Sequence, residues 1–357
     1  MKTGASQIAA VTLMAASLIY SQAAVAETRD LTIAASHTTA VPWVGVLKDH
    51  VQPEMNKRLK AAGSDLQINW TEGYGGVLYK FQDTLEAVES GLTDIGWVGT
   101  LWEPAKMPLQ QIAYNTPFTT DDLVGQLEIL NELHDEIPAM KQAWLDRNQV
   151  FLGAQGNETY HIFSKDPIRS LDDLKGKKIL APGPAANWLL GTGAVPVDGG
   201  LPSYYTQLKT GVADGAIVMV TGAYPFRLYE VAPYMTRVGI GSVFAGGMSI
   251  NKDTWDDLPK DAQGILRDLG REYTRLHAEE IMRRYSVFLT KMQEENGLTV
   301  IDLPAGDKKR WIDGLPNIAS DWVKQTGAKG LPAKEVLAAY MEKVRSKLGA
   351  PQRNWDQ

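Results

Sequence analysis

The sequence predicts an α/β protein made of two lobes with a cleft between them. Three observations carry this prediction. Apolar strand patterns alternate with amphipathic helix patterns, this alternation occurs in two successive runs along the chain, and one very long helical pattern follows them. Strands that alternate with helices form mainly parallel sheets, and ligands bind such sheets beyond the carboxyl ends of the strands. We therefore expect a ligand site in the cleft between the two lobes.

The first run has five predicted elements. Strands are expected at Asp30–Ser36, Leu66–Trp70 and Thr93–Val98, because each is a short apolar stretch. Helices are expected at Val44–Ala62 and Leu78–Glu89, where apolar residues recur every three or four positions.

The second run repeats this order of elements. Strands are expected at Val150–Ala154, Thr159–Ser164, Lys177–Ala181 and Gly215–Val220, with a helix at Asn187–Gly191. No long Pro, Ser or Gly tract separates the two runs, so the sequence indicates no flexible linker between the lobes.

The helical pattern after the two runs extends from Pro259 to Glu295, where Gly297 ends it. A helix of this length would measure about 55 Å, which is more than one lobe needs. It either crosses both lobes or is kinked near Gly270. Two shorter helices, Lys308–Gln325 and Ala333–Leu348, are predicted to complete the chain.

The predicted division of the chain has three parts. Residues 1–26 form an export signal, residues 27–152 form the first lobe with part of 240–285, and residues 153–239 form the second lobe with the helices of 286–357.

The export signal rests on the order of residues at the N-terminus. Lys2 precedes an apolar run from Ile8 to Tyr20, and Ala24-Val25-Ala26 is a small-x-small cleavage motif before Glu27. The run is shorter than the roughly 18 to 20 residues that span a bilayer. We therefore expect cleavage after Ala26 and a mature chain in the periplasm.

The composition argues against two classes of partner. The chain has no cysteine, so an exported form must be stabilised by its hydrophobic core and not by disulfides. Without Lys2 it has 35 basic and 42 acidic residues, a formal charge of −7. Nucleic acids and anionic membrane surfaces both call for a basic patch, so neither is expected as a partner.

Motifs for catalysis are missing from the sequence. The elbow Pro182-Gly183-Pro184 lacks the Lys-Ser/Thr pair of a phosphate loop, and no GxSxG motif offers a nucleophile. The five histidines have no metal-ligand spacing, and His37 and His161 are interpreted as hydrogen-bonding residues near strand ends. We expect no enzyme activity, catalytic residue, metal or cofactor.

Aromatic residues are concentrated near the predicted cleft. Four of the ten tryptophans lie at or just after predicted strand ends: Trp43, Trp97, Trp102 and Trp188. At least half of the ten should only fill the core, but these four can form aromatic walls around a small ligand. Tyr74, Phe118, Tyr160 and Tyr224 would join them. Such walls attract a cation by about 0.5 to 2 kcal/mol per contact.

Four segments, in matching order, resemble the solute-binding proteins of tripartite ATP-independent periplasmic (TRAP) transporters of the DctP type. They are Gly75–Val98, Ile168–Val197, Tyr204–Ala216 and Glu230–Gly239. The resemblance implies a type II-like periplasmic binding fold with a long helix spanning both lobes. It also implies a monomer that captures a small organic solute and delivers it to a small and a large membrane permease subunit, without catalysis.

The chain departs from this family at the position of its carboxylate-binding arginine. Family members usually place an arginine after the strand start that resembles KGKKI, where this chain has Leu180. A second family arginine aligns near Tyr160, and a family polar residue aligns near Val218 or Met219. Leucine cannot form the two-pronged hydrogen bonds of a guanidinium, so a dicarboxylate is a less suitable ligand than the family name suggests.

Two hypotheses for the ligand remain open. Glu158, with Trp and Tyr walls, would balance the ammonium of a small amine or zwitterion such as an amino alcohol. Alternatively, Arg227 or Lys178 would bind a monocarboxylate or sulfonate. A remote third possibility is an exported α/β enzyme. The predicted ligand-binding residues are His37, Trp43, Tyr74, Trp97, Trp102, Phe118, Glu158, Tyr160, Leu180, Trp188, Met219, Tyr224 and Arg227.

Overall fold

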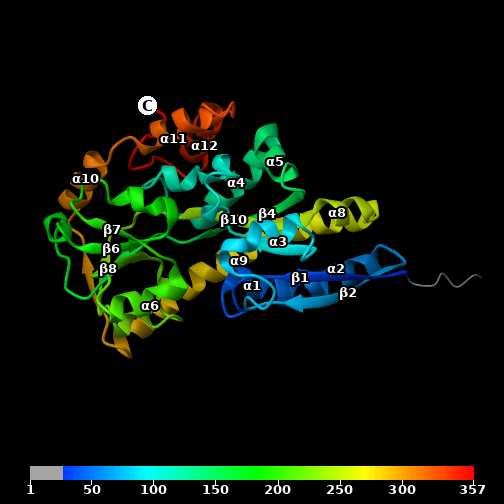
Figure 1. Cartoon of the computed structure of the whole chain (residues 1–357), viewed down its shortest axis with the longest axis horizontal. Coiled ribbons are helices and arrows are strands. Elements are labelled where there is room, and N and C mark those ends of the chain that lie inside the picture. The colour runs from blue at the N-terminus through cyan, green and yellow to red at the C-terminus, as the bar shows by residue number, and fades with distance from the viewer. Residues whose placement is uncertain (1–26) are drawn as a thin grey trace, which may run out of the picture.

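The computed structural model describes residues 27–357, which form two lobes, each built on its own β-sheet. Helices pack around both sheets, and the long helix α9 (Lys260–Glu294) runs from one lobe to the other (Figure 1). The predicted two-lobed α/β fold is therefore confirmed. The predicted export signal, residues 1–26, lies outside the described residues.

The sheet of the first lobe has five strands in the order β2-β1-β3-β10-β4. Their bounds are β1 Glu27–Ala34, β2 Leu66–Gly73, β3 Ile95–Val98, β4 Gln149–Asn157 and β10 Val243–Asn251. β1 is parallel to β2 and β3, whereas β10 is antiparallel to β3 and β4. All nine residues of β10 are buried, because this strand lies inside the sheet and beneath helices.

The sheet of the second lobe has six strands in the order β11-β9-β5-β8-β6-β7. Their bounds are β5 His161–Ser164, β6 Lys178–Ala181, β7 Val195–Asp198, β8 Gly215–Val218, β9 Tyr234–Arg237 and β11 Thr299–Asp302. β6 is parallel to β7 and β8, and β5 is antiparallel to β8 and β9.

Two chain segments cross between the sheets, and we call them the crossing segments: residues 158–160 between β4 and β5, and residues 238–242 between β9 and β10. They are hydrogen-bonded to each other. Ile240 N donates to Tyr160 O over 3.1 Å, and Gly241 N donates to Thr159 Oγ1 over 2.9 Å. These hydrogen bonds therefore hold the two crossing segments side by side between the lobes.

The helices of the first lobe follow the predicted pattern only in part. The expected helix Val44–Ala62 is confirmed as a continuous helical stretch that contains one π-helical turn. Its parts are α1 (Pro42–Val46), the π turn η1 (Leu47–Val51) and α2 (Gln52–Ala61). The expected helix Leu78–Glu89 begins later, with the 3₁₀ turn η2 (Phe81–Asp83) and then α3 (Thr84–Glu89).

Several elements of the first lobe were not expected from the sequence. They are the 3₁₀ turns η3 (Thr100–Trp102), η4 (Pro108–Gln111) and η5 (Ala113–Asn115), and the helices α4 (Leu123–Glu136), α5 (Pro138–Leu145) and α8 (Lys252–Asp257). The Asp122 side chain begins α4 by accepting a hydrogen bond from Gly125 N over 3.0 Å.

The second lobe has short helical elements: η6 Leu171–Leu174, η7 Gly183–Leu189, α6 Leu201–Lys209, α7 Val220–Ala223 and η8 Leu228–Glu230. The helix expected at Asn187–Gly191 is wrong in type and start. The chain turns into the 3₁₀ helix η7 already at Gly183, whose φ of +49° suits a residue without a side chain.

Helix α9 is one unbroken helix of 35 residues, about 52 Å long. It packs against α1, α2 and α4 of the first lobe and against α7 of the second. The long helix predicted to cross both lobes is confirmed. Gly270 and Gly153 let α9 approach strand β4 closely. A Cβ built on Gly270 would lie 2.3 Å from the Leu152 carbonyl oxygen, and one built on Gly153 would lie 2.0 Å from the Gly270 carbonyl oxygen.

Three helices complete the chain: α10 (Ala305–Gly314), α11 (Ile318–Gly327) and α12 (Ala333–Lys347). The single helix expected at Lys308–Gln325 is wrong, because Pro316 has no N–H and interrupts it. α10 packs on η6 of the second lobe, whereas α12 packs on α4 of the first. The exact borders of the lobes stay a prediction.

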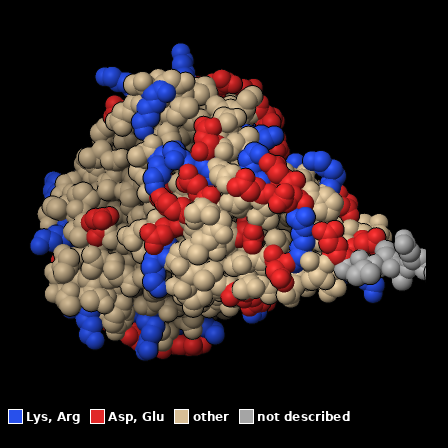
Figure 2. Space-filling view, turned by 45° about the vertical axis from the view of Figure 1, so that its right-hand side comes forward, with Lys and Arg blue, Asp and Glu red and all other residues tan. Residues whose placement is uncertain are grey.

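The surface carries both signs of charge in close mixture. The face shown in Figure 2 has acidic and basic side chains side by side over much of its area. On α9, Glu280 pairs with Arg283 and Arg284, and these hydrogen bonds lower the pKa of Glu280 to about 2. Between residues 27 and 357, no helix combines the length and the apolar character that crossing a bilayer requires.

The contact between α9 and β4 gives a stability prediction. In Gly270→Ala the new Cβ would lie 2.3 Å from Leu152 O, so the helix must move away from the sheet. We expect the free energy of unfolding to fall by about 2 kcal/mol or more, measured by urea denaturation. Gly264→Ala is the control, because Gly264 lies in the same helix and a Cβ built there would have no neighbouring atom within 4 Å. It should stabilise by up to about 1 kcal/mol, and equal effects of both variants would contradict the tight contact.

Candidate functional site

A small cavity lies between the lobes, with a volume of about 60 Å³. From the first lobe it is lined by His37, Trp43, Phe81, Trp97, Leu101, Trp102, Tyr114, Gln155, Asn157 and Ala245. From the second lobe and the first crossing segment it is lined by Tyr160, Pro182, Leu201, Pro202, Tyr204, Ile217, Val218 and Met219. Most of these residues follow strand ends or lie in the connections there, as the predicted topology requires.

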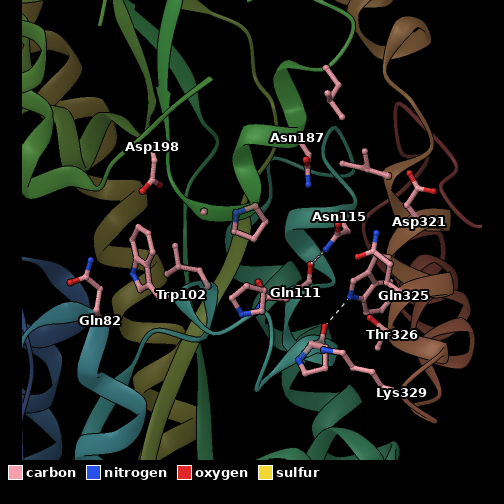
Figure 3. Close-up of a pocket in the computed structure, with 18 residues that line it drawn as sticks. Gln82, Trp102, Gln111, Asn115, Asn187, Asp198, Asp321, Gln325, Thr326 and Lys329 are labelled. Carbon is pink, nitrogen blue, oxygen red and sulfur yellow. Dashed lines mark hydrogen bonds between the residues drawn. The ribbon is translucent and has the colours of Figure 1, made fainter. Parts of the chain in front are cut away.

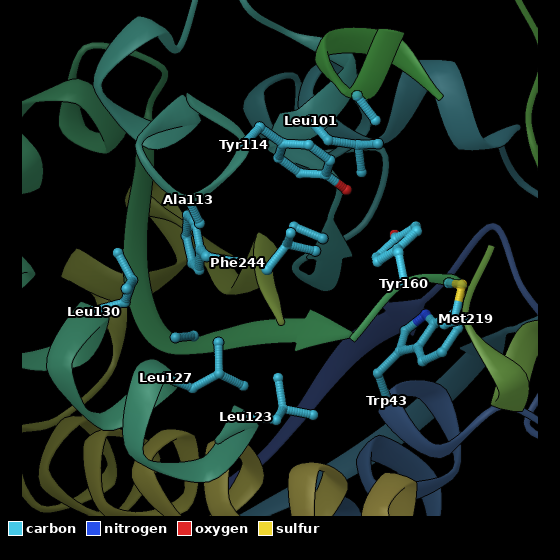
Figure 4. Packing of buried hydrophobic residues seen from close by; sticks show 14 of the residues in the cluster. Trp43, Leu101, Ala113, Tyr114, Leu123, Leu127, Leu130, Tyr160, Met219 and Phe244 are labelled. Atoms are coloured by element: carbon cyan, nitrogen blue, oxygen red, sulfur yellow. The ribbon is translucent and has the colours of Figure 1, made fainter. Parts of the chain in front are cut away.

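Aromatic rings form most of the cavity wall. His37 meets the edge of Trp97 at 5.2 Å and of Trp43 at 5.7 Å between ring centroids, and Phe81 meets Trp102 at 5.0 Å. The Tyr114 hydroxyl points toward Tyr160, and the Met219 sulfur lies beside the Trp43 indole (Figure 4). Edge-to-face packing of this kind holds the rings in fixed positions around the space.

Polar side chains lie on the first-lobe side of the cavity. Trp97 Nε1 donates to Gln155 Oε1 over 2.9 Å, Gln155 Nε2 donates to Gly156 O over 2.9 Å, and Asn157 Nδ2 donates to Tyr160 Oη over 3.3 Å. In contrast, the buried Trp43 Nε1 has no hydrogen-bond partner among the described residues, whereas the Tyr114 hydroxyl interacts with the side chain of Tyr160. One buried donor of the wall is therefore left without a hydrogen bond.

No charged group faces the cavity. None of its lining residues is Lys, Arg, Asp or Glu. His37 is the one imidazole, and burial lowers its pKa to about 4, so the ring is neutral at pH 7. Its Nδ1 lies 3.0 Å from Ser36 Oγ. The cavity is thus an uncharged aromatic space.

Six of the thirteen predicted site residues line this cavity. They are His37, Trp43, Trp97, Trp102, Tyr160 and Met219. Trp188 lies directly behind the wall: its ring stacks on Tyr114 at 5.5 Å, meets Tyr160 edge-on at 5.4 Å, and its Nε1 donates to Tyr114 O over 2.7 Å. Trp188 therefore supports two wall residues without lining the cavity.

Four other predicted residues pack in or against the hydrophobic core: Leu180 and Phe118 are fully buried, and Tyr74 and Tyr224 are partly buried. Leu180 is fully buried in β6, between β7 and β8. Phe118 packs edge-on against Trp311, Tyr224 stacks on Phe288 of α9 at 4.4 Å, and Tyr74 Oη donates to Gln52 Oε1 over 2.9 Å. The structure does not bring these four side chains to the cavity.

The two predicted charged residues also lie outside the cavity. Glu158 is buried in the first crossing segment, where its carboxylate accepts hydrogen bonds from Thr221 N over 2.7 Å and Thr221 Oγ1 over 2.9 Å. Burial raises the pKa of Glu158 to about 7. Arg227 follows α7 with a left-handed φ of +54°, is 67% exposed and pairs with Glu230.

Several wall residues were not singled out from the sequence. Gln155 and Asn157 both line the cavity because alternate residues of a strand share one face, whereas the neighbouring Glu158 is hydrogen-bonded to Thr221. Phe81 and Tyr204 lie in two of the segments that resemble the family, and Tyr114 lies outside them, but only the assembled lobes bring the three side chains together.

Metal binding finds no support in the described residues. Between residues 27 and 357 no group of three or more His, Asp or Glu side chains is placed to hold a metal ion. His134 and His161 are both buried and hydrogen-bonded within the protein: His134 to Leu130 O and Gln110 Oε1, and His161 to Tyr285 Oη and Gly239 N.

Comparisons with known proteins agree on one family. The profile of DctP, described as bacterial extracellular solute-binding protein family 7, matches residues 54–325. A solute-binding protein of Albidiferax ferrireducens is 31% identical over 177 residues, which are 48% of this chain and 51% of that protein. One of Sulfitobacter sp. NAS-14.1 is 25% identical over 218 residues, 60% of this chain and 64% of that protein. The chain thus spans about half to two thirds of the length of these curated relatives.

Solved structures share the fold. A TRAP periplasmic solute-binding protein of Desulfovibrio salexigens aligns with a TM-score of 0.76 and 22% identity, over 92% of this chain and 99% of that one. One of Rhodoferax ferrireducens, solved with copurified benzoate, aligns with a TM-score of 0.77 and 17% identity, over 90% and 100%. A Bordetella pertussis extracytoplasmic solute receptor that binds pyroglutamic acid gives 0.71 and 20%, over 87% and 99%.

The buried Glu158 gives a prediction of pH dependence. Because its pKa rises from the ordinary 4.5 to about 7 on folding, the native state binds this proton more tightly than the unfolded chain. Its contribution to stability is therefore present below pH 4.5 and is lost as the pH rises to 7. Glu158→Gln keeps an acceptor for Thr221 N and removes the buried charge. We expect it to stabilise the protein by up to about 3 kcal/mol at pH 8.

Urea denaturation at pH 5 and pH 8 checks this expectation. The gain from Glu158→Gln should shrink at pH 5, where the native carboxyl is already protonated. Glu279→Gln is the control, because Glu279 is half exposed on α9 and pairs only with Arg275. A Glu158→Gln protein no more stable than the native one at pH 8 would show that Glu158 is not a desolvated acid.

Proposed function

This chain belongs to the DctP family of bacterial extracellular solute-binding proteins, and we propose that it is the periplasmic solute-binding subunit of a TRAP transporter. In this proposal the export signal directs the chain to the periplasm, where it works as a monomer. It closes on one small organic solute in the cavity and delivers that solute to a small and a large permease subunit. We propose a binding role without catalysis.

The ligand class we propose is a small amine or zwitterion that also carries an oxygen acceptor, such as an amino alcohol. The observation that carries this proposal is the composition of the wall. Seven Phe, Trp and Tyr side chains and a neutral His37 line the cavity, with no charged group. The faces of aromatic rings are negative and attract cations, and an ammonium gains most from them when water is excluded.

The same wall is unfavourable for a carboxylate. Burying an unpaired anion costs several kcal/mol, and no guanidinium or ammonium group of the lining offsets that cost. Leu180, at the position where the family resemblance expects an arginine, is an apolar core residue. The benzoate and pyroglutamic acid of the structural neighbours are ligands of those proteins and are not carried over to this chain.

Two features narrow the ligand further. The buried Trp43 Nε1 needs an acceptor, which a ligand hydroxyl provides. The volume of about 60 Å³ is well below the roughly 150 Å³ that accommodates benzene in an engineered protein cavity. Both features favour a molecule of only a few non-hydrogen atoms.

The two charged residues considered from the sequence have less support as ligand partners. Glu158 is satisfied by Thr221, so the attraction for an ammonium would come from the rings and not from this carboxylate. Arg227, proposed for a monocarboxylate or sulfonate, is largely exposed and pairs with Glu230. No observation favours that alternative over the amine.

A thermal-shift panel tests the ligand class. Small amines, amino alcohols and zwitterions should raise Tm in a concentration-dependent way, because a ligand that binds only the native state stabilises it by RT ln(1 + [L]/Kd). Carboxylates and sulfonates of the same size should not. The matched pairs are 2-aminoethanol against glycolate, and taurine against ethanesulfonate. Stabilisation by the anions alone would overturn the proposed class while leaving the receptor role intact.

A single substitution tests the contact with Trp43. Trp43→Phe keeps an aromatic face and removes the unpaired Nε1 donor. We expect the Kd of the best binder from the panel to rise about 3- to 10-fold by calorimetry, the usual value of one hydrogen bond. Trp255→Phe is the control, because Trp255 lies on α8 against Arg267, outside the cavity. Equal effects of the two variants would exclude a specific hydrogen bond from Trp43.

A further inference from the structure

A larger hollow lies beside the cavity, and we call it the outer hollow. Its volume is about 580 Å³, against about 60 Å³ for the cavity. Leu101 and Trp102 of the 3₁₀ turn η3 line both spaces. In Figure 3, Trp102 lies at one end of the outer hollow, near Gln82 and Asp198. These two consecutive residues therefore form a partition between a small space and a much larger one.

Each residue of this partition packs on a glycine of the second lobe. A Cβ built on Gly200 would lie 3.4 Å from Trp102 Cη2 and 3.4 Å from Phe81 Cζ, so both rings lie directly against the glycine backbone. A Cβ built on Gly183 would lie 3.2 Å from Leu101 O. The partition is thus completed by both lobes, at the seam where they meet.

The Trp102 ring is also fixed from the side of the first lobe. Phe81 meets it edge-on, with 5.0 Å between the ring centroids. A Cβ built on Gly99 would lie 2.9 Å from Trp97 Cη2 and 3.3 Å from Trp102 Cδ1, so only a glycine leaves room for both indoles there. Close packing on several sides holds the Trp102 ring as a wall of the cavity.

We propose that Trp102 sets the maximum length of the solute by closing the cavity against the outer hollow. This proposal rests on the proposed function, because the solute meant is the small amine or zwitterion assigned to the cavity. A longer chain must extend past a wall residue, and the outer hollow lies behind only two of the lining residues, Leu101 and Trp102. Of these two, Trp102 has the larger side chain, and Leu101 meets Gly183 through its backbone oxygen, which a substitution would keep.

A homologous series of amino alcohols tests this length limit. The Kd values of 2-aminoethanol, 4-amino-1-butanol and 6-amino-1-hexanol would be measured by calorimetry for the native protein and for Trp102→Ala. Each buried methylene lowers Kd about 4-fold, so a chain that reaches into the outer hollow gains affinity with its length. We expect the Kd of 6-amino-1-hexanol, divided by that of 2-aminoethanol, to fall about 10-fold or more in Trp102→Ala. This ratio cancels any loss of ring contact with the ammonium group.

Met219→Ala is the control, because Met219 lines the cavity but not the outer hollow. It enlarges the cavity without joining the two spaces, so its Kd ratio should fall by less than about 4-fold, the value of one methylene. An equal fall in both variants would mean that added volume alone relaxes the limit. That result, or an unchanged ratio in Trp102→Ala, would overturn the role of Trp102.

Acrylamide quenching of tryptophan fluorescence tests the partition without any solute. Trp43 and Trp97 line the cavity and are only 4% and 3% exposed. The variants Trp102→Ala and Trp102→Phe lack the same fluorophore, but the second keeps a ring in the partition. We expect a higher quenching constant in Trp102→Ala, because acrylamide would reach the cavity tryptophans from the outer hollow.

The two measurements separate a failure of this proposal from a failure of the proposed function. If no amino alcohol binds any of these proteins, the proposed ligand class is wrong, while a higher quenching constant in Trp102→Ala supports the partition. Equal quenching constants in the two Trp102 variants would overturn the partition, whatever binds in the cavity.

Discussion

The hydrogen bonds between the two crossing segments connect the two lobes beside the cavity, and the position of the cavity wall depends on them. Ile240 N bonds Tyr160 O, Gly241 N bonds Thr159 Oγ1, and Gly239 N bonds His161 Nδ1 at 3.2 Å. The first segment also carries Tyr160 into the cavity wall and Glu158 to the start of α7, next to Met219. The two short crossing segments thus join the lobes together with α9, and the first of them also shapes the cavity and contacts a helix of the second lobe.

Because no charged residue lines the cavity, recognition of a ligand depends on its desolvation cost and on its shape. An uncharged wall gives an anion no compensation for lost water, whereas an ammonium retains favourable contact with ring faces. Selectivity of this kind depends on fixed rings, because a loosely held indole would admit water. The layer behind the wall, with Trp188 stacked on Tyr114 and edge-on to Tyr160, keeps those rings in place.

The fold was predictable because each long element has a strong local signal. The α9 pattern and the alternation of strands and helices survive in the structure, whereas β10 was not predicted because Gly246, Gly247 and Ser249 interrupt its apolar residues. The site was predictable where it depends on strand ends, as for His37, Trp43 and Trp97. It was not predictable where one step along β4 decides which side chain faces inward, as for Asn157 and Glu158, or where Tyr114 and Tyr204 meet only after the lobes assemble.

The unbroken course of α9 constrains how the lobes can move. Because one rigid helix packs on α1 and α2 in the first lobe and on α7 in the second, the lobes cannot slide apart along it without losing one of these contacts. If the lobes rotate about the crossing segments, side chains close to that axis, such as Asn157 and Tyr160, would move little. Side chains at greater radius would travel along an arc, so a given angle of opening would widen the entrance far more than it would disturb the floor of the cavity.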